Sequence, residues 1–260
     1  MALAAPVYLR AALSSGDPSE PLATLGRAGL CADERARLEC IRHAPTAAGF
    51  LVGRALLRGA LERHVGAGPW CLVEGPRGKP AIEGRPDVGV NISHTQGCVV
   101  VALTLGGEVG VDVEAPGRDT DTDKIAHRYF AATELEALRS LPDAASRRAR
   151  FFALWTLKES YMKATGQGFA MPLGSFAFTF DEAGAQRGFR ADPERDPAWQ
   201  TWRFARGEVR AEEVSFPVAL CARWGDVGPA SELDVRWEAP PYSQARTSLA
   251  SAKISWIRSP

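Results

Sequence analysis

The sequence lacks features that would assign it at once to a broad class. It has no excess of one charge, because 31 Lys and Arg residues balance 31 Asp and Glu residues. The net charge therefore favours neither nucleic acid nor an anionic membrane as a partner. The sequence also has no apolar run long enough to span a membrane, and no basic segment ahead of a short apolar one. We therefore expect no membrane association and no secretion signal.

Cysteine is sparse, and no two cysteines form a Cys-x-x-Cys pair. The five cysteines are Cys31, Cys40, Cys71, Cys98 and Cys221. Their scatter and odd number argue against a zinc site and against a disulfide framework. The pattern thus predicts a protein of the reducing cytoplasm.

The composition is that of an ordinary globular protein. Of the 260 residues, 45% are hydrophobic and 24% are charged, which leaves ample material for a buried core. The length suits one large domain or two modest ones. Because the overall charge is balanced, recognition of a charged partner must depend on local clusters.

The segment from Phe151 to Gly168 predicts an apolar helix that carries charged residues. At 3.6 residues per turn, Trp155, Glu159 and Lys163 share one stripe, and Lys158 lies roughly 100° around the helix from Glu159. A solvated face with a Glu-to-Lys pair is the ordinary interpretation of such a stripe. The neighbouring Phe, Leu, Tyr and Met residues leave little polar circumference, so we expect these charges where apolar walls meet a cleft.

An earlier helical segment, from Thr46 to Gly66, lies among many arginines. The basic residues between positions 27 and 64 outnumber the acidic ones, and the arginines are Arg27, Arg35, Arg37, Arg42, Arg54, Arg58 and Arg63. A surface laced with salt bridges explains this bias as well as a site for a bound phosphate does. Both interpretations stay open on the pattern alone.

Two acidic residues are expected side by side on a strand. Asp112 and Glu114 are two residues apart in the strand-like segment from Gly110 to Glu114, so their side chains point to the same face. Adjacent carboxylates repel unless a cation lies between them, and Mg²⁺ typically binds one or two carboxylates. An edge strand with two solvated acids is the alternative, and it is the better one for an isolated Asp-x-Glu. The run from Asp119 to Asp123 begins like a calcium loop, but Lys124 replaces the glycine that such a loop needs.

The order of elements predicts an α+β fold with two similar, pseudo-symmetric lobes. In each half a long helix ends at a glycine and is followed by several short strands. Shifting one half onto the other by 100 residues places Arg58 on Lys158. We therefore expect each lobe to pack a long helix on a small antiparallel sheet, with the active site between the lobes. The predicted parts are an N-terminal lobe (1–115), a C-terminal lobe (116–225) and a C-terminal extension (226–260).

Three motifs in a fixed order resemble a known enzyme family. They are Val90 to Thr95 (VNISHT), Gly110 to Glu114 (GVDVE), and Phe152 to Gly166, which contains WTLKES and KATG. Together they resemble the three signature motifs of the surfactin-type 4′-phosphopantetheinyl transferases, within a similarity that runs from about Ala47 to Ala222. Each motif alone is a weak signal, whereas the ordered set is specific.

The resemblance implies an Mg²⁺-dependent phosphoryl transfer. Phosphopantetheine would move from coenzyme A to a serine of an acyl or peptidyl carrier domain, with release of adenosine 3′,5′-bisphosphate. The resemblance further implies that Asp112, Glu114 and Glu159 bind Mg²⁺ against the pyrophosphate. Glu159, or a water that it holds, is the candidate base for the carrier serine.

The resemblance also implies a set of phosphate-binding residues. Ser93 and His94 match a pair that hydrogen-bonds the phosphates of coenzyme A, and Lys163 matches a lysine that contacts the pyrophosphate. The expected catalytic residues are Glu159, Lys163 and His94. Lys158 is a further motif residue that we expect to face phosphate.

Arg58 and Lys79 match positions that line the nucleotide pocket in this family. Binding of the 3′-phosphate there would explain the arginine bias. The segment from His43 to Thr46 offers none of the further Lys or Arg residues that family members often carry at this place. Arg37 and Arg42 are possible substitutes.

Two other functions stay open at this level. A coenzyme A or nucleotide pyrophosphate hydrolase would use the same metal with water as the nucleophile. A non-catalytic module that binds coenzyme A or carrier proteins would need the pocket but not the carboxylates. We expect a cytoplasmic monomer with coenzyme A and carrier domains as partners, and with neither nucleic acid nor membrane among them.

Overall fold

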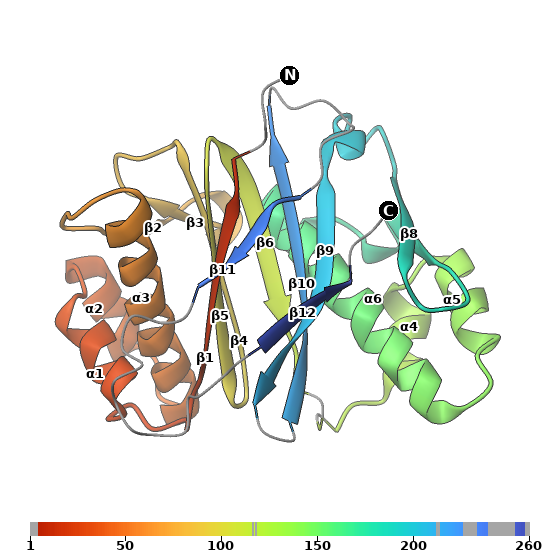
Figure 1. Cartoon of the computed structure of the whole chain (residues 1–260), viewed down its shortest axis with the longest axis horizontal. Helices are drawn as coiled ribbons and strands as arrows, with labels where there is room; N and C mark the ends of the chain where they lie inside the picture. Colours follow the sequence, from red (N-terminus) through yellow and green to blue (C-terminus); the bar gives the residue numbers. More distant parts are fainter. Residues whose placement is uncertain are drawn as a thin grey trace.

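The computed structural model describes residues 5–115, 117, 119–211, 214–225, 233–238 and 253–257. The chain forms four layers: two sheets pack against each other in the middle, and helices cover the outer face of each sheet (Figure 1). Within these ranges, none of the helices combines the length and the hydropathy that a membrane span requires.

The first half of the chain forms one lobe. Its elements are β1 (Val7–Leu13), α1 (Pro21–Ala28), α2 (Ala32–Glu39), α3 (Ala44–His64), β2 (Leu72–Glu74), β3 (Pro80–Ile82), β4 (Val88–Thr95) and β5 (Cys98–Leu105). β1, β5 and β4 are antiparallel neighbours in a sheet of order β11-β1-β5-β4. β2 and β3 form a separate two-stranded sheet.

The second half repeats this arrangement. Its elements are β6 (Gly107–Val113), α4 (Thr122–Tyr129), α5 (Ala132–Arg139), α6 (Ala144–Thr165), β7 (Phe176–Phe180), β8 (Gln186–Ala191), β9 (Arg203–Ala211) and β10 (Val214–Trp224). β6, β10 and β9 are antiparallel neighbours in a sheet of order β12-β9-β10-β6. The separate two-stranded sheet here is β7 with β8.

Three apolar layers hold the structure together. One lies between α3 and the first sheet, one between the two sheets, and one between α6 and the second sheet. β5 shows how one strand serves two layers, because Val99 and Val101 face α3 whereas Val100 and Ala102 face the second sheet. Alternate residues of a strand point to opposite faces, so an all-apolar strand is what this position requires.

The long helix α6 has a clear start and a clear stop. The Asp143 carboxylate accepts a hydrogen bond from the Ser146 N–H at 2.8 Å, which satisfies one of the free donors of the first turn. The helix ends at Gly166, whose φ of 65° lies in the left-handed region that glycine adopts without strain. The predicted glycine stop is thus confirmed for this helix.

The two halves match at an offset of 100 residues. α2 and α5 share both bounds at this offset, α3 and α6 share their start, and β1 and β6 share both bounds. The sheet orders also correspond, with β1-β5-β4 in one lobe and β6-β10-β9 in the other. The predicted fold of two similar α+β lobes, each with a long helix on a small sheet, is confirmed.

The position of β6 corrects the predicted boundary between the lobes. We expected residues 1–115 to form the first lobe, which would include this strand. β6 instead pairs with β10 along its whole length, from Val113 opposite Val218 to Gly107 opposite Trp224. It is the first strand of the second lobe, just as β1 is the first strand of the first. The strand carrying the two acids therefore lies on the same sheet that α6 covers.

The predicted C-terminal extension contributes strands to both sheets. β11 (Val235–Trp237) runs parallel to β1, and β12 (Lys253–Ile257) is antiparallel to β9. The remaining residues of 226–260 lie outside the described residues. Within the described part, the extension therefore belongs to the sheets and is not an independent unit.

The cysteines correct a second prediction. Cys31 and Cys71 form a disulfide, with their Cα atoms 5.7 Å apart and a sequence separation of 40. We expected no disulfide framework, because the five cysteines are scattered, odd in number and without a Cys-x-x-Cys pair. The pairing joins the start of α2 to the chain just before β2, and sequence spacing does not reveal such a contact.

Candidate active site

Gly110 brings α6 unusually close to β6. A Cβ atom at this position would lie 2.1 Å from the Ser160 carbonyl oxygen and 2.4 Å from the Ala164 nitrogen. These distances are far below van der Waals contact, so any side chain here would push the helix away from the strand. Side chains of α6 consequently reach the acidic residues of β6.

Asp112 forms one hydrogen-bonded cluster with Ser93 and Lys163. The Lys163 ammonium contacts Asp112 Oδ1 at 2.6 Å and Ser93 Oγ at 3.0 Å, and Ser93 Oγ donates to Asp112 Oδ1 at 3.0 Å. Asp112 is only 5% exposed. The structure therefore brings together three residues predicted from three separate motifs, on β4, β6 and α6.

Glu114 lies against the same helix about two turns earlier, at Trp155. Its Oε1 accepts a hydrogen bond from the Trp155 indole N–H at 3.0 Å. Trp155 and Lys163 lie four residues before and after Glu159, on one stripe of α6. Because Trp155 reaches Glu114 and Lys163 reaches Asp112, Glu159 lies on the stripe that faces this part of β6.

The three predicted metal ligands do not form a ready cluster. Across the described ranges, no group of three or more His, Cys, Asp or Glu residues is gathered so that it could hold a metal ion. Lys163 is paired with one oxygen of Asp112, and Trp155 with one oxygen of Glu114. Asp112 Oδ2, however, is a buried carboxylate oxygen without a hydrogen-bond partner among the described residues. Such an oxygen is costly to bury, and hard oxygen donors suit Mg²⁺, so the donor chemistry fits this ion.

A cavity of about 590 Å³ opens on the face of β4 that carries Ile92 and His94. Its lining mixes charged and apolar residues from α2, α3, β2, β3 and β4, among them Arg37, Phe50, Arg54, Leu72, Glu74 and His94. His94 follows Ser93 directly on β4, so the two side chains point to opposite faces of this edge strand, and the cavity and the cluster lie on either side of it. Burial of the imidazole, together with the charge of Lys163, lowers the pKa of His94. His94 is therefore neutral at pH 7 and can donate one hydrogen bond.

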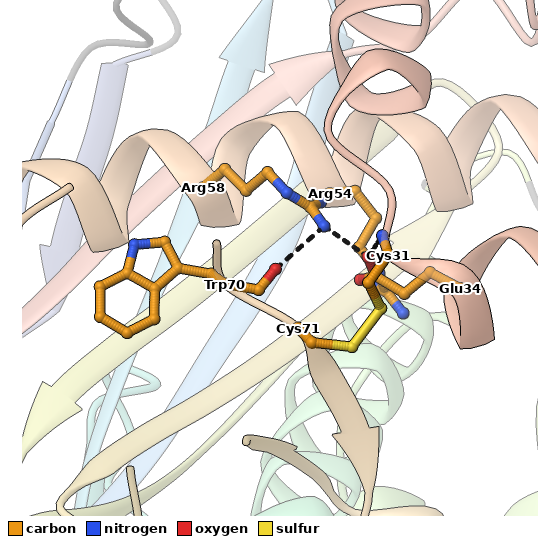
Figure 2. The surroundings of a disulfide bond; sticks show 6 residues. All are labelled: Cys31, Glu34, Arg54, Arg58, Trp70 and Cys71. Carbon is orange, nitrogen blue, oxygen red and sulfur yellow. Dashed lines mark hydrogen bonds and ion pairs between the residues drawn. A yellow bond between two sulfur atoms is a disulfide. The ribbon is translucent and has the colours of Figure 1, made fainter. Parts of the chain in front are cut away.

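Arg54, not Arg58, lines the cavity. The Arg54 guanidinium lies 2.6 Å from Glu34 Oε1, 4.3 Å from the centre of the Phe50 ring, and on the cavity wall. Burial lowers the pKa of Arg54 to about 10, which still leaves it charged at pH 7. Arg58 instead donates to Glu34 and to the Trp70 carbonyl (Figure 2). Arg58, predicted to line the nucleotide pocket, therefore does not line this cavity, whereas Arg54, one turn earlier on α3, does.

Lys79 bridges the two lobes. Its ammonium donates to the Ala164 carbonyl in the last turn of α6 and to Glu108 Oε1 at 3.3 Å. Its neighbours Gly78 and Pro80 line the cavity, whereas the Lys79 side chain runs along Gly166. The structure therefore places this ammonium in the contact between the lobes and not on the cavity wall.

The prediction that Lys158 faces phosphate is wrong. Its side chain is fully buried, and its ammonium lies 2.7 Å from Glu134, 2.8 Å from the Leu173 carbonyl and 2.7 Å from the Phe176 carbonyl. Burial lowers the pKa of Lys158, and Glu134 opposes that effect. With three acceptors and no access to solvent, this ammonium fixes α6 to α5 and to the start of β7.

Asn91 is a structural residue that the motif analysis did not assign. Its side-chain oxygen accepts a hydrogen bond from the Val111 N–H at 3.0 Å, and Ser93 Oγ accepts one from the Val113 N–H at 3.3 Å. Both acceptors project from β4, an edge strand of the first sheet, onto β6 of the second. Their i, i+2 spacing was the available signal, since it places both side chains on one face of β4.

Comparison with known proteins gives a consistent result. Residues 108–221, from β6 to β10, match the model described as "4'-phosphopantetheinyl transferase superfamily". A 4'-phosphopantetheinyl transferase of Bacillus subtilis is 32% identical over 183 residues, which cover 68% of this chain and 76% of that protein. The transferase psf-1 of Bacillus pumilus is 32% identical over 196 residues, covering 71% of this chain and 82% of that protein. The transferase HetI of Nostoc sp. is 36% identical over 148 residues, which cover 55% of this chain and only 62% of HetI.

Proposed function

Because the chain belongs to the 4'-phosphopantetheinyl transferase superfamily, we propose that it transfers 4'-phosphopantetheine from coenzyme A to a carrier-domain serine. The serine oxygen attacks the phosphorus that bears the pantetheine arm. The bond from that phosphorus to the bridging oxygen breaks, adenosine 3′,5′-bisphosphate leaves, and the serine loses its proton. The observation that carries this proposal is that β4 carries both Ser93, which belongs to the cluster with Asp112 and Lys163, and His94, which lines the cavity together with Arg54.

The cavity suits the nucleotide half of coenzyme A. Arg54 offers a buried guanidinium, and charge-assisted hydrogen bonds from such a group to phosphate are strong. His94 offers a neutral imidazole on the cavity wall, from the strand that also carries Ser93. Phe50 and Leu72 supply the apolar surface that a purine ring needs.

The cluster suits the pyrophosphate. Lys163 is 28% exposed along its side chain and lies beside Ser93 and Asp112, where its charge would stabilise the leaving bisphosphate oxygen. Mg²⁺ held by Asp112, Glu114 and Glu159 would supply further charge neutralisation at the pyrophosphate. Glu159, or a water that it holds, accepts the serine proton.

The test is a direct assay for the product. The protein is incubated with coenzyme A, Mg²⁺ and an apo carrier domain, and the carrier is weighed by mass spectrometry. We expect a phosphopantetheine adduct on the carrier serine. No adduct across several carriers would overturn the proposal, and steady cleavage of coenzyme A without a carrier would indicate a hydrolase instead.

Substitution of Glu159 tests its assigned role. Because Glu159→Gln removes both a metal ligand and a base without changing size, we expect transfer to slow by at least about 100-fold. Circular dichroism and thermal unfolding should remain unchanged. Glu136→Gln is the matched control, since Glu136 lies exposed on α5. Wild-type rates in Glu159→Gln would remove this residue from the mechanism.

We also propose that the enzyme acts as a cytoplasmic monomer. The candidate site draws all of the residues named for it from one chain, on elements that include α2, α3, β2, β4, β6 and α6, so no second copy is needed to complete it. Size-exclusion chromatography with light scattering would test the oligomeric state.

A further inference from the structure

The Cys31–Cys71 disulfide lies behind one wall of the cavity. Cys31 is the residue just before α2, and Cys71 is the residue just before β2. α2 contributes Glu34 and Arg37 to the cavity lining, and β2 contributes three lining residues, Leu72, Val73 and Glu74. The disulfide therefore ties together the two segments that form this wall.

Both segments have few other attachments. Glu34 is the one buried residue of α2, and all eight residues of this helix are described. β2 has three residues and belongs to a two-stranded sheet that is separate from both main sheets. Segments that bury few apolar groups open locally at low free-energy cost, so a covalent link has a large influence on their position.

The disulfide also borders the ion pairs that position Arg54. Glu34 accepts the Cys31 N–H at 3.1 Å, pairs with Arg54 and accepts a hydrogen bond from Arg58. Arg58 in turn donates to the carbonyl of Trp70, the residue that precedes the second cysteine (Figure 2). Movement of α2 away from β2 would therefore shift the carboxylate that holds Arg54 at the cavity.

We propose that the Cys31–Cys71 disulfide is a redox-sensitive staple that sets how tightly the cavity binds coenzyme A. This inference rests on the proposed function. A dithiol reductant supplies two electrons and two protons, the S–S bond becomes two thiols, and the dithiol becomes a cyclic disulfide. A small-molecule disulfide such as oxidised glutathione reverses the step. In the reduced state α2 is held by its ion pairs, among them Arg37 with Glu74 of β2, and by the packing of Leu38 against the first core. The wall is then less firmly ordered, ligand binding must supply part of the free energy that orders it, and the affinity falls.

The other cysteines are poorly placed to interfere. Cys98 and Cys221 are fully buried, and burial raises the pKa of Cys98 to about 12, so neither offers an accessible thiolate. Cys40 is free and exposed at the end of α2. By contrast, Cys31 and Cys71 are partly exposed, so a soluble dithiol can reach their bond.

The experiment measures the Kd of coenzyme A by isothermal titration for the full chain, oxidised or treated with dithiothreitol, with thiol content counted by mass spectrometry. We expect reduction to raise the Kd at least fivefold. The Cys31→Ser/Cys71→Ser variant should bind weakly in both conditions, and Cys40→Ser should respond as the wild type does. An equal Kd in the oxidised and fully reduced wild type would overturn the inference.

Two further readouts separate a staple from a general loss of structure. Reduction should raise the KM for coenzyme A and leave kcat unchanged at saturating coenzyme A. Amide hydrogen exchange should quicken in Asp33–Glu39 and not in α6. A fall in kcat with faster exchange throughout the chain would contradict a local staple. If coenzyme A binds tightly in both states, only this inference fails, whereas no binding in either state overturns the proposed function as well.

Discussion

The two lobes contain the same buried ion pair at equivalent positions, and they use it differently. Glu34 pairs with Arg58 in the first lobe, and Glu134 pairs with Lys158 in the second. Both acids and both bases are 100 residues apart, and each acid also accepts the backbone N–H three residues before it. The pair is thus a repeated device that joins a short helix to the long one.

The surroundings of the two pairs decide their roles. In the second lobe Lys158 is sealed by two further carbonyl acceptors, and the residue equivalent to Arg54 is the buried Leu154. In the first lobe Glu34 holds a second arginine, Arg54, which lies on the cavity wall. The Glu134–Lys158 pair stabilises the core of the second lobe. The Glu34–Arg58 pair instead supports Arg54, a guanidinium on the cavity wall that can pair with an anion.

The largest expected effect comes from breaking the buried Lys158–Glu134 ion pair. Lys158→Met leaves Glu134 buried without its cation, so we expect a loss of about 3–5 kcal/mol in the free energy of unfolding. Arg58→Met should cost only about 1–2 kcal/mol, because Arg54 remains beside Glu34. Urea unfolding of both variants measures the difference. Equal losses would show that the two pairs are energetically alike.

The next effect follows from making α3 resemble α6. Arg54→Leu introduces the residue found at the equivalent position of α6, and it removes a charged donor from the cavity. Since a hydrogen bond to a charged group contributes about 1.5–3 kcal/mol, we expect the KM for coenzyme A to rise about 10- to 100-fold. Arg63→Leu, at a side chain that is 65% exposed, is the matched control. An unchanged KM for Arg54→Leu would remove this residue from the binding site.

The smallest effect concerns pH. Because the pKa of His94 is lowered below 6.5, the ring is neutral at pH 7. A bound phosphate favours the imidazolium, so binding raises this pKa, and affinity should increase as pH falls through the interval between the free and bound values. We expect coenzyme A to bind about two- to fivefold more tightly at pH 5.5 than at pH 7.5, relative to His94→Gln.

Dividing the affinity of the wild type by that of His94→Gln removes the contribution of the phosphates, because their own titration affects both proteins equally. Titrations in buffers of different ionisation enthalpy should show more proton uptake on binding by the wild type than by His94→Gln. A constant ratio across the pH range would mean that His94 does not contact the phosphates.

Patterns that are local in sequence predicted much of this molecule. The two long helices, the paired acids at the end of β6 and the offset of 100 residues follow from periodicity and spacing, and the structure contains each of them, although Glu114 lies one residue beyond the strand. The grouping of Ser93, Asp112 and Lys163 followed from the ordered motifs. These features depend on residues that are close in sequence or on motifs that are specific as a set.

The errors concern contacts that depend on distant partners. Which face of α6 is buried depends on α5 and on the turn before β7, so the helix alone could not show that Lys158 is sealed. The lobe to which β6 belongs depends on β10, about 100 residues away. The pairing of Cys31 with Cys71 likewise depends on how α2 folds back along β2.

Gly110 has a consequence that reaches beyond its own position. Because Gly110 has no side chain, α6 can lie close against β6. Trp155, Glu159 and Lys163 reach their positions beside β6 only because of this close approach. A Gly110→Ala substitution would move all three of these side chains away from β6 together, although it would change none of their functional groups. The absence of a side chain at Gly110 therefore sets the distance between α6 and β6, on which the arrangement of the site depends.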